Sequence, residues 1–247
     1  MSTHPRFSII VPAHNEEALL QRGLDAIHAA IARAGANAEI VVIANRCTDS
    51  TESIAAASGA VVVRDGHRNL SATRNAGVAA STGEIIVTID ADTIMHPDAL
   101  VEVDRLARSG TYVGGGCRFV LERTSLGLAV TTFAVTSATT LSRVGGVMYW
   151  CSREDFDAIG GFDEGRRVGE DLDFAFRLRR HGRTTNRRFR NVRDARAVVS
   201  VRKFDTYGDW HYLTRFGRAL VHPRELRDML RGTDSTFVDE YFFDYNA

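Results

Sequence analysis

The chain has 247 residues, of which 44% are hydrophobic and 25% are charged, and its 31 Lys and Arg balance 31 Asp and Glu. This length and apolar content suffice for one large α/β domain with a buried core, and they exclude wholesale disorder. Four prolines and 21 glycines exclude a collagen-like or low-complexity chain. The formal net charge of zero argues against a protein that coats nucleic acid.

Strand and helix signals alternate over the first 110 residues. Uniformly apolar runs of strand length cover 7–11, 40–44, 61–63 and 84–89. Apolar residues at helical spacing follow the first run, at Leu20, Leu24, Ile27 and Ile31. Uniformly apolar strands separated by helices predict a mostly parallel sheet covered on both faces.

Helix boundaries are marked by short polar signals. Asp49-Ser50-Thr51-Glu52 resembles a capping box that starts a helix, and Gly59 is placed to end it. A short helix is predicted over 71–80, with Gly83 as its breaker. His96-Pro97-Asp98 predicts a further helix to about Ser109, with proline at its first position.

Polar clusters follow the predicted strands, at 12–16, 45–49 and 90–92. Because ligands of parallel α/β sheets bind beyond the carboxyl ends of the strands, we expect one cleft to collect all three clusters.

The second half of the chain is less regular. Two strands are predicted at 112–116 and 117–121 around a glycine triplet, and irregular loops at 145–151 and 160–162. A helix is predicted over Glu170 to Arg180, with Leu172, Ala175, Phe176 and Arg179 on one face. There is no internal repeat and no Pro/Ser-rich linker, so we expect a single compact domain. Its divisions are 1–110 and 111–232, with a C-terminal tail at 233–247.

Asp90-Ala91-Asp92 is the most informative triplet. Two carboxylates just past a buried strand can both reach a hard divalent cation such as Mg²⁺ or Mn²⁺, which takes one or two carboxylates plus phosphates and water. A solvated turn is the alternative, since Asp is common in turns.

The triplet is one of several motifs that occur in a fixed order. They resemble the family 2 glycosyltransferases of the GT-A (Rossmann-like) fold, over roughly residues 7 to 182. The motifs are Ile9-Ile10-Val11-Pro12-Ala13-His14-Asn15-Glu16, Val42 to Thr51, Arg74-Asn75-Ala76-Gly77, Thr82 to Asp92, Gly160 to Glu164, and Gly169-Glu170-Asp171.

The resemblance implies a role for each matching residue. Pro12, Ala13, Asn15 and Glu16 would hold the nucleoside of a nucleotide-diphosphate sugar, and Asn45 and Asp49 would read its base. Arg74 would lie near the base or the diphosphate. Asp90 and Asp92, with Ala91 between them, would form the DxD motif, and Asp92 is the stronger metal candidate. Asn45 and Arg46 stand where the family often has an acidic residue and a glycine, so the base of the donor stays open.

By the same resemblance, Glu170-Asp171 would supply the catalytic carboxylate, with Asp171 as the usual base and Glu170 as the second candidate. A general base contributes about 10²–10⁴-fold to a rate. Attack by an acceptor from the face opposite the leaving group would invert the anomeric centre. The alternative is that both acids only complement the dipole of a helix N-terminus.

Other residues are open to two interpretations. Nine arginines lie within Arg177–Arg196, either as a solvated face or as a site for a phosphate-bearing acceptor or an anionic membrane surface. His211 or His222 would either complete a metal shell, as a later histidine does in some enzymes of this fold, or be merely exposed or hydrogen-bonded. Arg202 and Lys203 would clamp a diphosphate. Tyr149 and Trp150 are either walls of the site or core residues. Aromatic residues from Phe237 to Tyr245 would dock on this domain or on a second copy.

The cysteines and the apolar stretches argue against disulfides, a structural zinc site, a signal peptide and a membrane-spanning helix. Cys47, Cys117 and Cys151 form no CxxC pair, which argues against a disulfide framework or a structural zinc site. The N-terminus has no signal-peptide core. Thr124 to Ser142 lacks charge, but nine of its 19 residues are Ser or Thr, so we expect a buried helix or a lip against an acceptor or membrane, and no spanning helix.

Together these observations predict a metal-dependent, inverting and non-processive hexosyltransferase-type enzyme in the cytoplasm. Its partners would be a nucleotide-diphosphate sugar and an unidentified acceptor, which is a glycan, a small molecule or a lipid-linked compound. Nucleic acid is not expected as a partner; contact with the inner face of the membrane and a homodimer stay open. The rivals are a sugar nucleotidyltransferase, disfavoured because no glycine lies between Met1 and Arg22, and a nucleotide-sugar-binding module without turnover.

Overall fold

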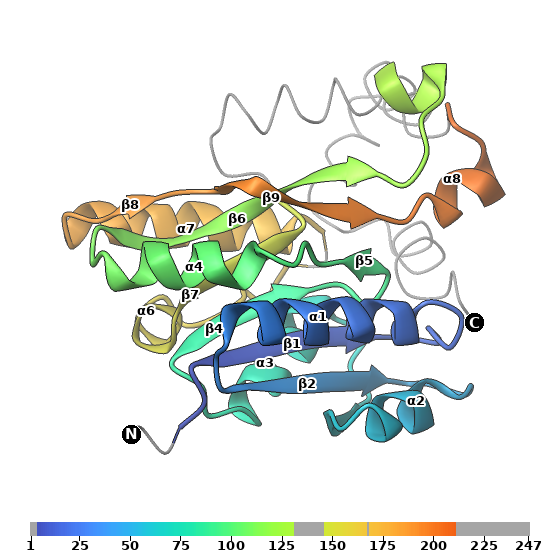
Figure 1. Cartoon of the computed structure of the whole chain (residues 1–247), viewed down its shortest axis with the longest axis horizontal. Coiled ribbons are helices and arrows are strands. Elements are labelled where there is room, and N and C mark those ends of the chain that lie inside the picture. The colour runs from blue at the N-terminus through green and yellow to red at the C-terminus, as the bar shows by residue number, and fades with distance from the viewer. Residues whose placement is uncertain (1–3, 131–145, 167, 211–247) are drawn as a thin grey trace.

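A computed structural model describes residues 4–130, 146–166 and 168–210 (Figure 1). His211, His222, the aromatic tail from Phe237 to Tyr245 and most of the uncharged Thr124–Ser142 stretch lie outside the described residues. Within the described part, no helix is long and apolar enough to cross a membrane.

The first half alternates strands and helices, as predicted. The elements are β1 (Phe7–Ala13), α1 (Leu20–Ala34), β2 (Ala38–Asn45), α2 (Thr51–Ala57), β3 (Val61–Asp65), α3 (Leu70–Ala79), β4 (Ile85–Ile89), β5 (Thr93–Ile94) and α4 (Ala99–Arg108). The predicted start of α2 is confirmed: the helix begins at Thr51, whose backbone N–H donates to Oδ1 of Asp49, while Ser50 makes no side-chain capping bond. One boundary prediction was wrong. Pro97 precedes Asp98, the N-cap of α4, and is therefore not the first helical residue.

Four of these strands form the parallel part of the sheet. β1 pairs in parallel with β2 on one side and with β4 on the other, and β2 pairs in parallel with β3. In Figure 1 the arrowheads of β1 and β2 point to the same side of the molecule. The carboxyl ends of these strands therefore share one edge of the sheet.

The second half continues the same sheet with mixed pairing. Its elements are β6 (Tyr112–Leu121), β7 (Met148–Ser152), α6 (Arg153–Ala158), α7 (Glu170–Thr184), β8 (Arg188–Phe189), β9 (Val192–Val199) and α8 (Arg202–Tyr207). β7 runs antiparallel between β4 and β6, β9 lies parallel to β6, and the strand order is β3-β2-β1-β4-β7-β6-β9-β5, with β8 beside β6. The predicted break at the glycine triplet and the predicted loop over the described residues of 145–151 were wrong, because β6 is continuous and β7 is a central strand.

The glycine triplet lies inside β6 because a neighbouring backbone approaches it closely. A Cβ at Gly115 would lie 1.7 Å from the carbonyl oxygen of Arg190 and 2.9 Å from Nε1 of Trp150. No side chain fits in that space, so glycine here marks a close contact between strands and not a turn.

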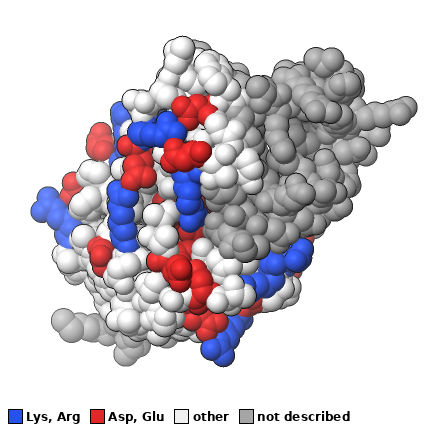
Figure 2. Space-filling view, turned by 90° about the vertical axis from the view of Figure 1, so that its right-hand side faces the viewer, with Lys and Arg blue, Asp and Glu red and all other residues white. Residues whose placement is uncertain are grey.

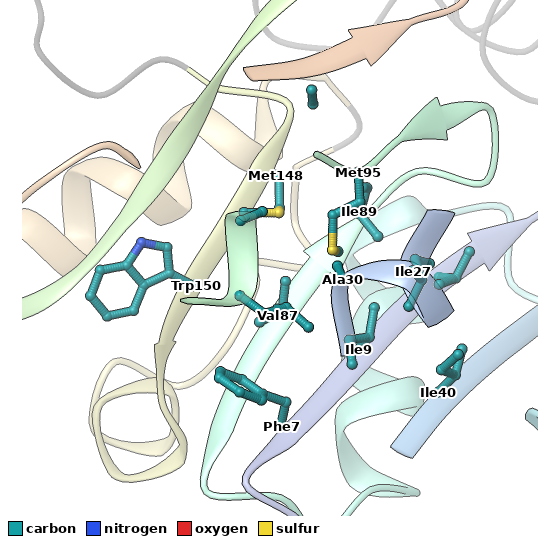
Figure 3. Packing of buried hydrophobic residues seen from close by; sticks show 14 of the residues in the cluster. Phe7, Ile9, Ile27, Ala30, Ile40, Val87, Ile89, Met95, Met148 and Trp150 are labelled. Atoms are coloured by element: carbon teal, nitrogen blue, oxygen red, sulfur yellow. The ribbon is translucent and has the colours of Figure 1, made fainter. Parts of the chain in front are cut away.

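The core has two layers, one on each face of the sheet. On one face, alternate residues of β1 and β2 pack against α1 and α4; on the other, the intervening residues pack against α3, α6 and α7. Figure 3 shows the first layer, with Ile9 of β1 near Ile27 and Ala30 of α1, and with Phe7 of β1 near Val87 of β4. Burial of one Phe or Ile side chain in this layer stabilises the folded state by about 1.5–3 kcal/mol.

Tyr149 and Trp150 belong to this core. They are only 3% and 1% exposed and take part in opposite layers, as expected for neighbours on a strand. Of the two interpretations of these aromatic residues, the core role is the one that the structure supports.

Candidate functional site

The loops that follow β1 and β2 interlock at the carboxyl edge of the sheet. Oδ1 of Asn15 accepts a hydrogen bond of 2.8 Å from the backbone N–H of Thr48. The two carboxylate oxygens of Asp49 accept from the backbone N–H groups of Glu17 and Thr51, at 3.0 and 2.9 Å. Burial by itself would raise the pKa of Asp49, but hydrogen bonds from Thr51 and Glu17 outweigh burial and lower the pKa. Asp49 therefore remains ionised and ties the two loops together.

Asn45 lies at the end of β2 and is only 7% exposed. Its Nδ2 lies within hydrogen-bond distance of Oδ2 of Asp65, the carbonyl oxygen of His67 and Oγ1 of Thr73, at 2.6, 2.7 and 3.1 Å. The amide thus joins β2 to the end of β3 and to α3. The next residue, Arg46, has a φ of 51°, a left-handed conformation that glycine adopts more readily than arginine.

Asp65 was missed by the sequence reasoning. Burial favours a raised pKa, but hydrogen bonds from Thr73, His67 and Asn45 prevail, so the pKa of this carboxyl is lowered. Its position two residues after the apolar run 61–63 was a usable signal, because the other polar clusters also follow strands.

The first-strand residues lie where β1 ends. Pro12 and Ala13 are buried and pair with Ile43 and Ala44 of β2. Glu16 is 8% exposed, and Nη2 of Arg202 donates to its Oε1 and Oε2 at 2.8 and 3.0 Å. Arg202 is the first residue of α8, so this ion pair connects the first strand loop to the far end of the described chain.

Arg74 lies at the centre of a second group of charges. It is 6% exposed and donates from Nη1 to Oε1 of Glu170 at 2.8 Å and from Nη2 to Oδ1 of Asp90 at 2.9 Å. Its guanidinium carbon also lies 5.3 Å from the ring centre of Phe162. Arg74 therefore connects the loop after β4 to the start of α7.

Asp171 lies beside this group, one residue after Glu170. It is half-buried, and its Oδ1 accepts from the backbone N–H of Leu172 at 2.8 Å. Burial, followed by the charge of Glu170, raises the pKa of Asp171 to about 6, while Arg74 acts in the opposite direction. A carboxyl group that titrates close to neutral pH is suited to accept and release a proton.

Asp90 and Asp92 have different surroundings. Asp90 is paired with Arg74, whereas half-buried Asp92 lines a small pocket between the first loop and β9, together with Leu19, Arg22, Ile94, Glu122, Val198 and Ser200. Ala91 between them is buried beneath α1, and a Cβ at Gly23 would lie 2.8 Å from its carbonyl oxygen.

The carboxylates of Asp90 and Asp92 have the chemistry that a hard divalent cation prefers. Among the described residues no group of three or more His, Cys, Asp and Glu is arranged to hold a metal. A donor set of two carboxylates nevertheless fits Mg²⁺ or Mn²⁺, because such ions in phosphate-transfer and related sites take their remaining ligands from substrate phosphates and water.

The charge on this side of the molecule is mixed. Figure 2 shows the face toward which β1 and β2 point in Figure 1, and acidic and basic side chains are interspersed over its described part. The described part of this face therefore has no broad field of one sign, and ion pairs such as those of Arg74 and Arg202 neutralise its charges locally.

Two family profiles match the sequence. The profile described as glycosyl transferase family 2 matches residues 8–127. The profile described as glycosyl transferase family group 2 matches residues 85–215, and this second match alone covers more than half of the chain. The chain belongs to the family 2 glycosyltransferases. The resemblance of its ordered motifs to this family is thereby confirmed.

A curated relative of this family 2 chain is the succinoglycan biosynthesis protein ExoO of Rhizobium meliloti (strain 1021). The two are 33% identical over 114 residues, which is 44% of this chain and 32% of the relative. The match thus spans about a third of the relative's length.

Solved structures share the fold of this family 2 chain. A mannosyltransferase from Pyrobaculum calidifontis, in complex with GDP-Man and Mn²⁺, has a TM-score of 0.66 at 20% identity, covering 99% of this chain and 72% of its own. S. aureus TarS in complex with UDP-GlcNAc has a TM-score of 0.61 at 16% identity, with 79% and 58% covered. The expected GT-A architecture of a single α/β domain is confirmed.

Proposed function

We propose that this chain transfers a sugar from a nucleotide-diphosphate sugar to an acceptor hydroxyl or phosphate in a single, inverting and non-processive step. The observation that carries the proposal is the group formed by Arg74, Asp90 and Glu170 next to Asp171. This group brings the DxD loop close to a carboxyl group with a pKa near 6. Sugar transfer from a diphosphate needs both parts, one to hold the diphosphate and one to accept a proton.

Asp171 is the proposed general base. Its raised pKa makes it a stronger base than an ordinary carboxylate while leaving it mostly ionised at neutral pH. Glu170 is less suited to this role, because Oε1 of Glu170 is held by Arg74 in a buried ion pair. We therefore assign to Glu170 the positioning of Arg74, and to Asp171 the uptake of the proton from the attacking hydroxyl.

The donor is proposed to bind at the carboxyl edge of β1, β2 and β4. Asn15 and Asp49 support this assignment indirectly, since they shape the two loops that would enclose the nucleoside. Glu16 would accept hydrogen bonds from the ribose hydroxyls in place of its present bond from Arg202. Neighbours of the same fold were solved with GDP-Man and with UDP-GlcNAc, so both guanosine and uridine donors need to be tested.

Asp92, supported by Asp90, would hold Mg²⁺ or Mn²⁺. When bound, the ion supplies Lewis-acid stabilisation of the charge that develops on the departing diphosphate. Arg74 contributes by keeping the Asp90 side of the DxD loop in place through its hydrogen bond to Oδ1.

A turnover screen tests the proposal. Purified protein is incubated with UDP-, GDP- and TDP-sugars and Mn²⁺, and release of the nucleoside diphosphate is measured, with Asp171→Asn as the matched low-activity control. We expect one donor class to be hydrolysed slowly without acceptor and faster when a crude acceptor mixture is added. If no donor is turned over but nucleotide sugars still bind, a binding module without turnover replaces this proposal.

A further inference from the structure

Glu16 and Arg202 form an ion pair that joins the loop after β1 to the first residue of α8. Nη2 of Arg202 donates to Oε1 and Oε2 of Glu16 at 2.8 and 3.0 Å, and the side chains of Arg202 and Glu16 are 29% and 11% exposed. The pair therefore occupies the acceptor oxygens that the proposed function assigns to the ribose. Arg202 lies where part of the donor would bind.

The DxD loop lies close to the same arginine. β5 directly follows Asp92 and pairs antiparallel with the end of β9, with Thr93 opposite Val199. Asp92 and Ser200 accordingly line one pocket, and Oγ of Ser200 accepts a hydrogen bond of 3.2 Å from the backbone N–H of Arg202. Arg202 therefore lies between the ribose end of the proposed donor site and the end that would hold the diphosphate.

A second set of contacts holds the rest of α8. Arg123, in the loop after β6, donates from Nε to Oδ1 of Asp205 at 3.0 Å and from Nη2 to Oδ1 of Asp209 at 2.8 Å. These contacts do not involve Glu16 or Arg202. If the pair of Glu16 and Arg202 separated, Arg123 would still hold α8 on the domain, so the Arg202 side chain can change its partner without release of the helix.

We propose that the Glu16–Arg202 pair, which we call the latch, opens when the donor binds. The ribose hydroxyls take the place of Arg202 on Glu16, and the released guanidinium binds the diphosphate of the same donor. This inference rests on the proposed function, because it takes Glu16 as the ribose ligand. A diphosphate carries more negative charge than one carboxylate, and a guanidinium binds phosphate oxygens through paired N–H donors, so a complete donor favours the open latch.

The latch acts differently on the two parts of the donor. A nucleoside without phosphate has to separate Glu16 from Arg202 and offers the arginine no anion in return, so the closed latch weakens nucleoside binding. A nucleoside diphosphate supplies that anion. The latch therefore selects against free nucleosides and makes recognition of the ribose depend on the diphosphate.

The test is calorimetric titration of UDP, GDP, uridine and guanosine into the unmodified protein and into Arg202→Met, all with Mn²⁺. We expect Arg202→Met to bind the nucleoside of the preferred base roughly 5-fold more tightly, because Glu16 is then open to the ribose. The same variant should bind the matching diphosphate roughly 10-fold less tightly, since a charge-assisted contact is lost. A purely structural role of Arg202 would not move the two affinities in opposite directions.

Three further variants separate the latch from general damage to α8. Glu16→Gln removes the carboxylate and keeps the arginine, so the ratio of diphosphate to nucleoside affinity should stay near that of the unmodified protein, whereas Arg202→Met lowers it. Arg202→Lys keeps the positive charge and should shift both affinities in the same directions as Arg202→Met, but less. Arg123→Met removes an exposed pair at the other end of α8 and should leave each affinity within about twofold.

Parallel losses of nucleoside and diphosphate affinity in Arg202→Met, no change in either, or the same changes in Arg123→Met would overturn the latch. Circular dichroism checks the fold of each variant, and Arg202→Lys carries the test if Arg202→Met does not fold. Diphosphate binding by the unmodified protein together with unchanged affinities in the variants removes only the latch. If the unmodified protein binds no nucleoside diphosphate, the donor site of the proposed function fails, and the latch fails with it.

Discussion

The two groups of polar residues at the carboxyl edge of the sheet are held in different ways. Around Asn15, Asn45 and Asp49, hydrogen bonds from amide and backbone N–H groups join one loop to the next, and the pKa of Asp49 is lowered. Around Arg74, one buried cation lies among Asp90, Glu170 and Asp171, and the pKa of Asp171 is raised. The first group stabilises the ionised form of its acid, while the second makes ionisation of Asp171 costly.

This difference separates residues that shape the site from residues that are poised for chemistry. A lowered pKa means that the folded protein gains by keeping a carboxylate charged, which is typical of a structural contact. A raised pKa means that the fold tolerates an unfavourable charge, which is typical of an active site. Substitutions in the two groups should therefore change different measured quantities.

The largest effect is expected at Asp171. Asp171→Asn should lower the rate of sugar transfer about 10²–10⁴-fold while nucleotide binding persists, because only the proton acceptor is removed. In the unmodified enzyme the base acts when ionised, so kcat/KM should fall as the pH drops through about 6, and this acidic limb should be absent from the residual activity of the variant. Initial rates from pH 4.5 to 8 check both statements, and an unchanged transfer rate would exclude Asp171 as the base.

Arg74 should give the largest effect on folding. Arg74→Met leaves Asp90 and Glu170 without their buried cation, so the free energy of unfolding should fall by about 3–5 kcal/mol. Arg6→Met is the matched control, because Arg6 forms more exposed pairs with Glu84 and Asp104 and should cost only about 0–1 kcal/mol. Urea denaturation of both variants measures the difference; similar losses would mean that the burial of Arg74 has no special energetic role.

Nucleoside diphosphate and metal together should stabilise the folded protein. At 100 times its Kd, a ligand that binds only the native state adds about 2.7 kcal/mol. Thermal unfolding with UDP, GDP or TDP, each with and without Mn²⁺, should show this gain for one nucleotide, and Asp92→Asn should remove the part that depends on Mn²⁺. Melting curves that are the same for every nucleotide would count against the donor site.

The loop network should respond more weakly and without any effect on pH dependence. Asn45→Ala leaves Asp65 and Thr73 without one hydrogen-bond donor, which should reduce the free energy of unfolding by about 1–3 kcal/mol. The pH at which activity is half-maximal should stay at that of the unmodified enzyme. A shifted acidic limb in Asn45→Ala would show that the two groups are coupled, and the distinction drawn above would fail.

Local pattern was sufficient for the parallel half of the sheet. Buried strands read as continuous apolar runs, and Gly59 and Gly83 lie between the elements where the sequence placed breaks. It was insufficient for β6 and β7, since the glycines at 114–116 look like a turn unless the approach of the Arg190 backbone is known. For α7 the pattern did not show which face is buried, because apolar residues occur on both sides of this helix, and only packing shows that Phe174 and Leu178 face the core.

The site was predictable as a set of residues but not as a set of contacts. Ordered motifs pointed to Arg74, Asp90, Glu170 and Asp171, which the fold brings together. The contacts among them join residues that are far apart in the sequence, such as Arg74 and Glu170, which are 96 residues apart. No periodicity within one segment encodes such a pair. The bond between Glu16 and Arg202, 186 residues apart, is of the same kind.

The close approach at Gly115 limits how this domain can change over evolution or by engineering. Even a methyl group at this position would meet the Arg190 carbonyl and the Trp150 ring, and would force β6, β7 and the chain before β9 apart. Because β7 also pairs with β4, the disturbance would reach the strand that directly precedes Asp90. Libraries that seek altered sugar selectivity should therefore diversify the helix surfaces and keep Gly115 unchanged.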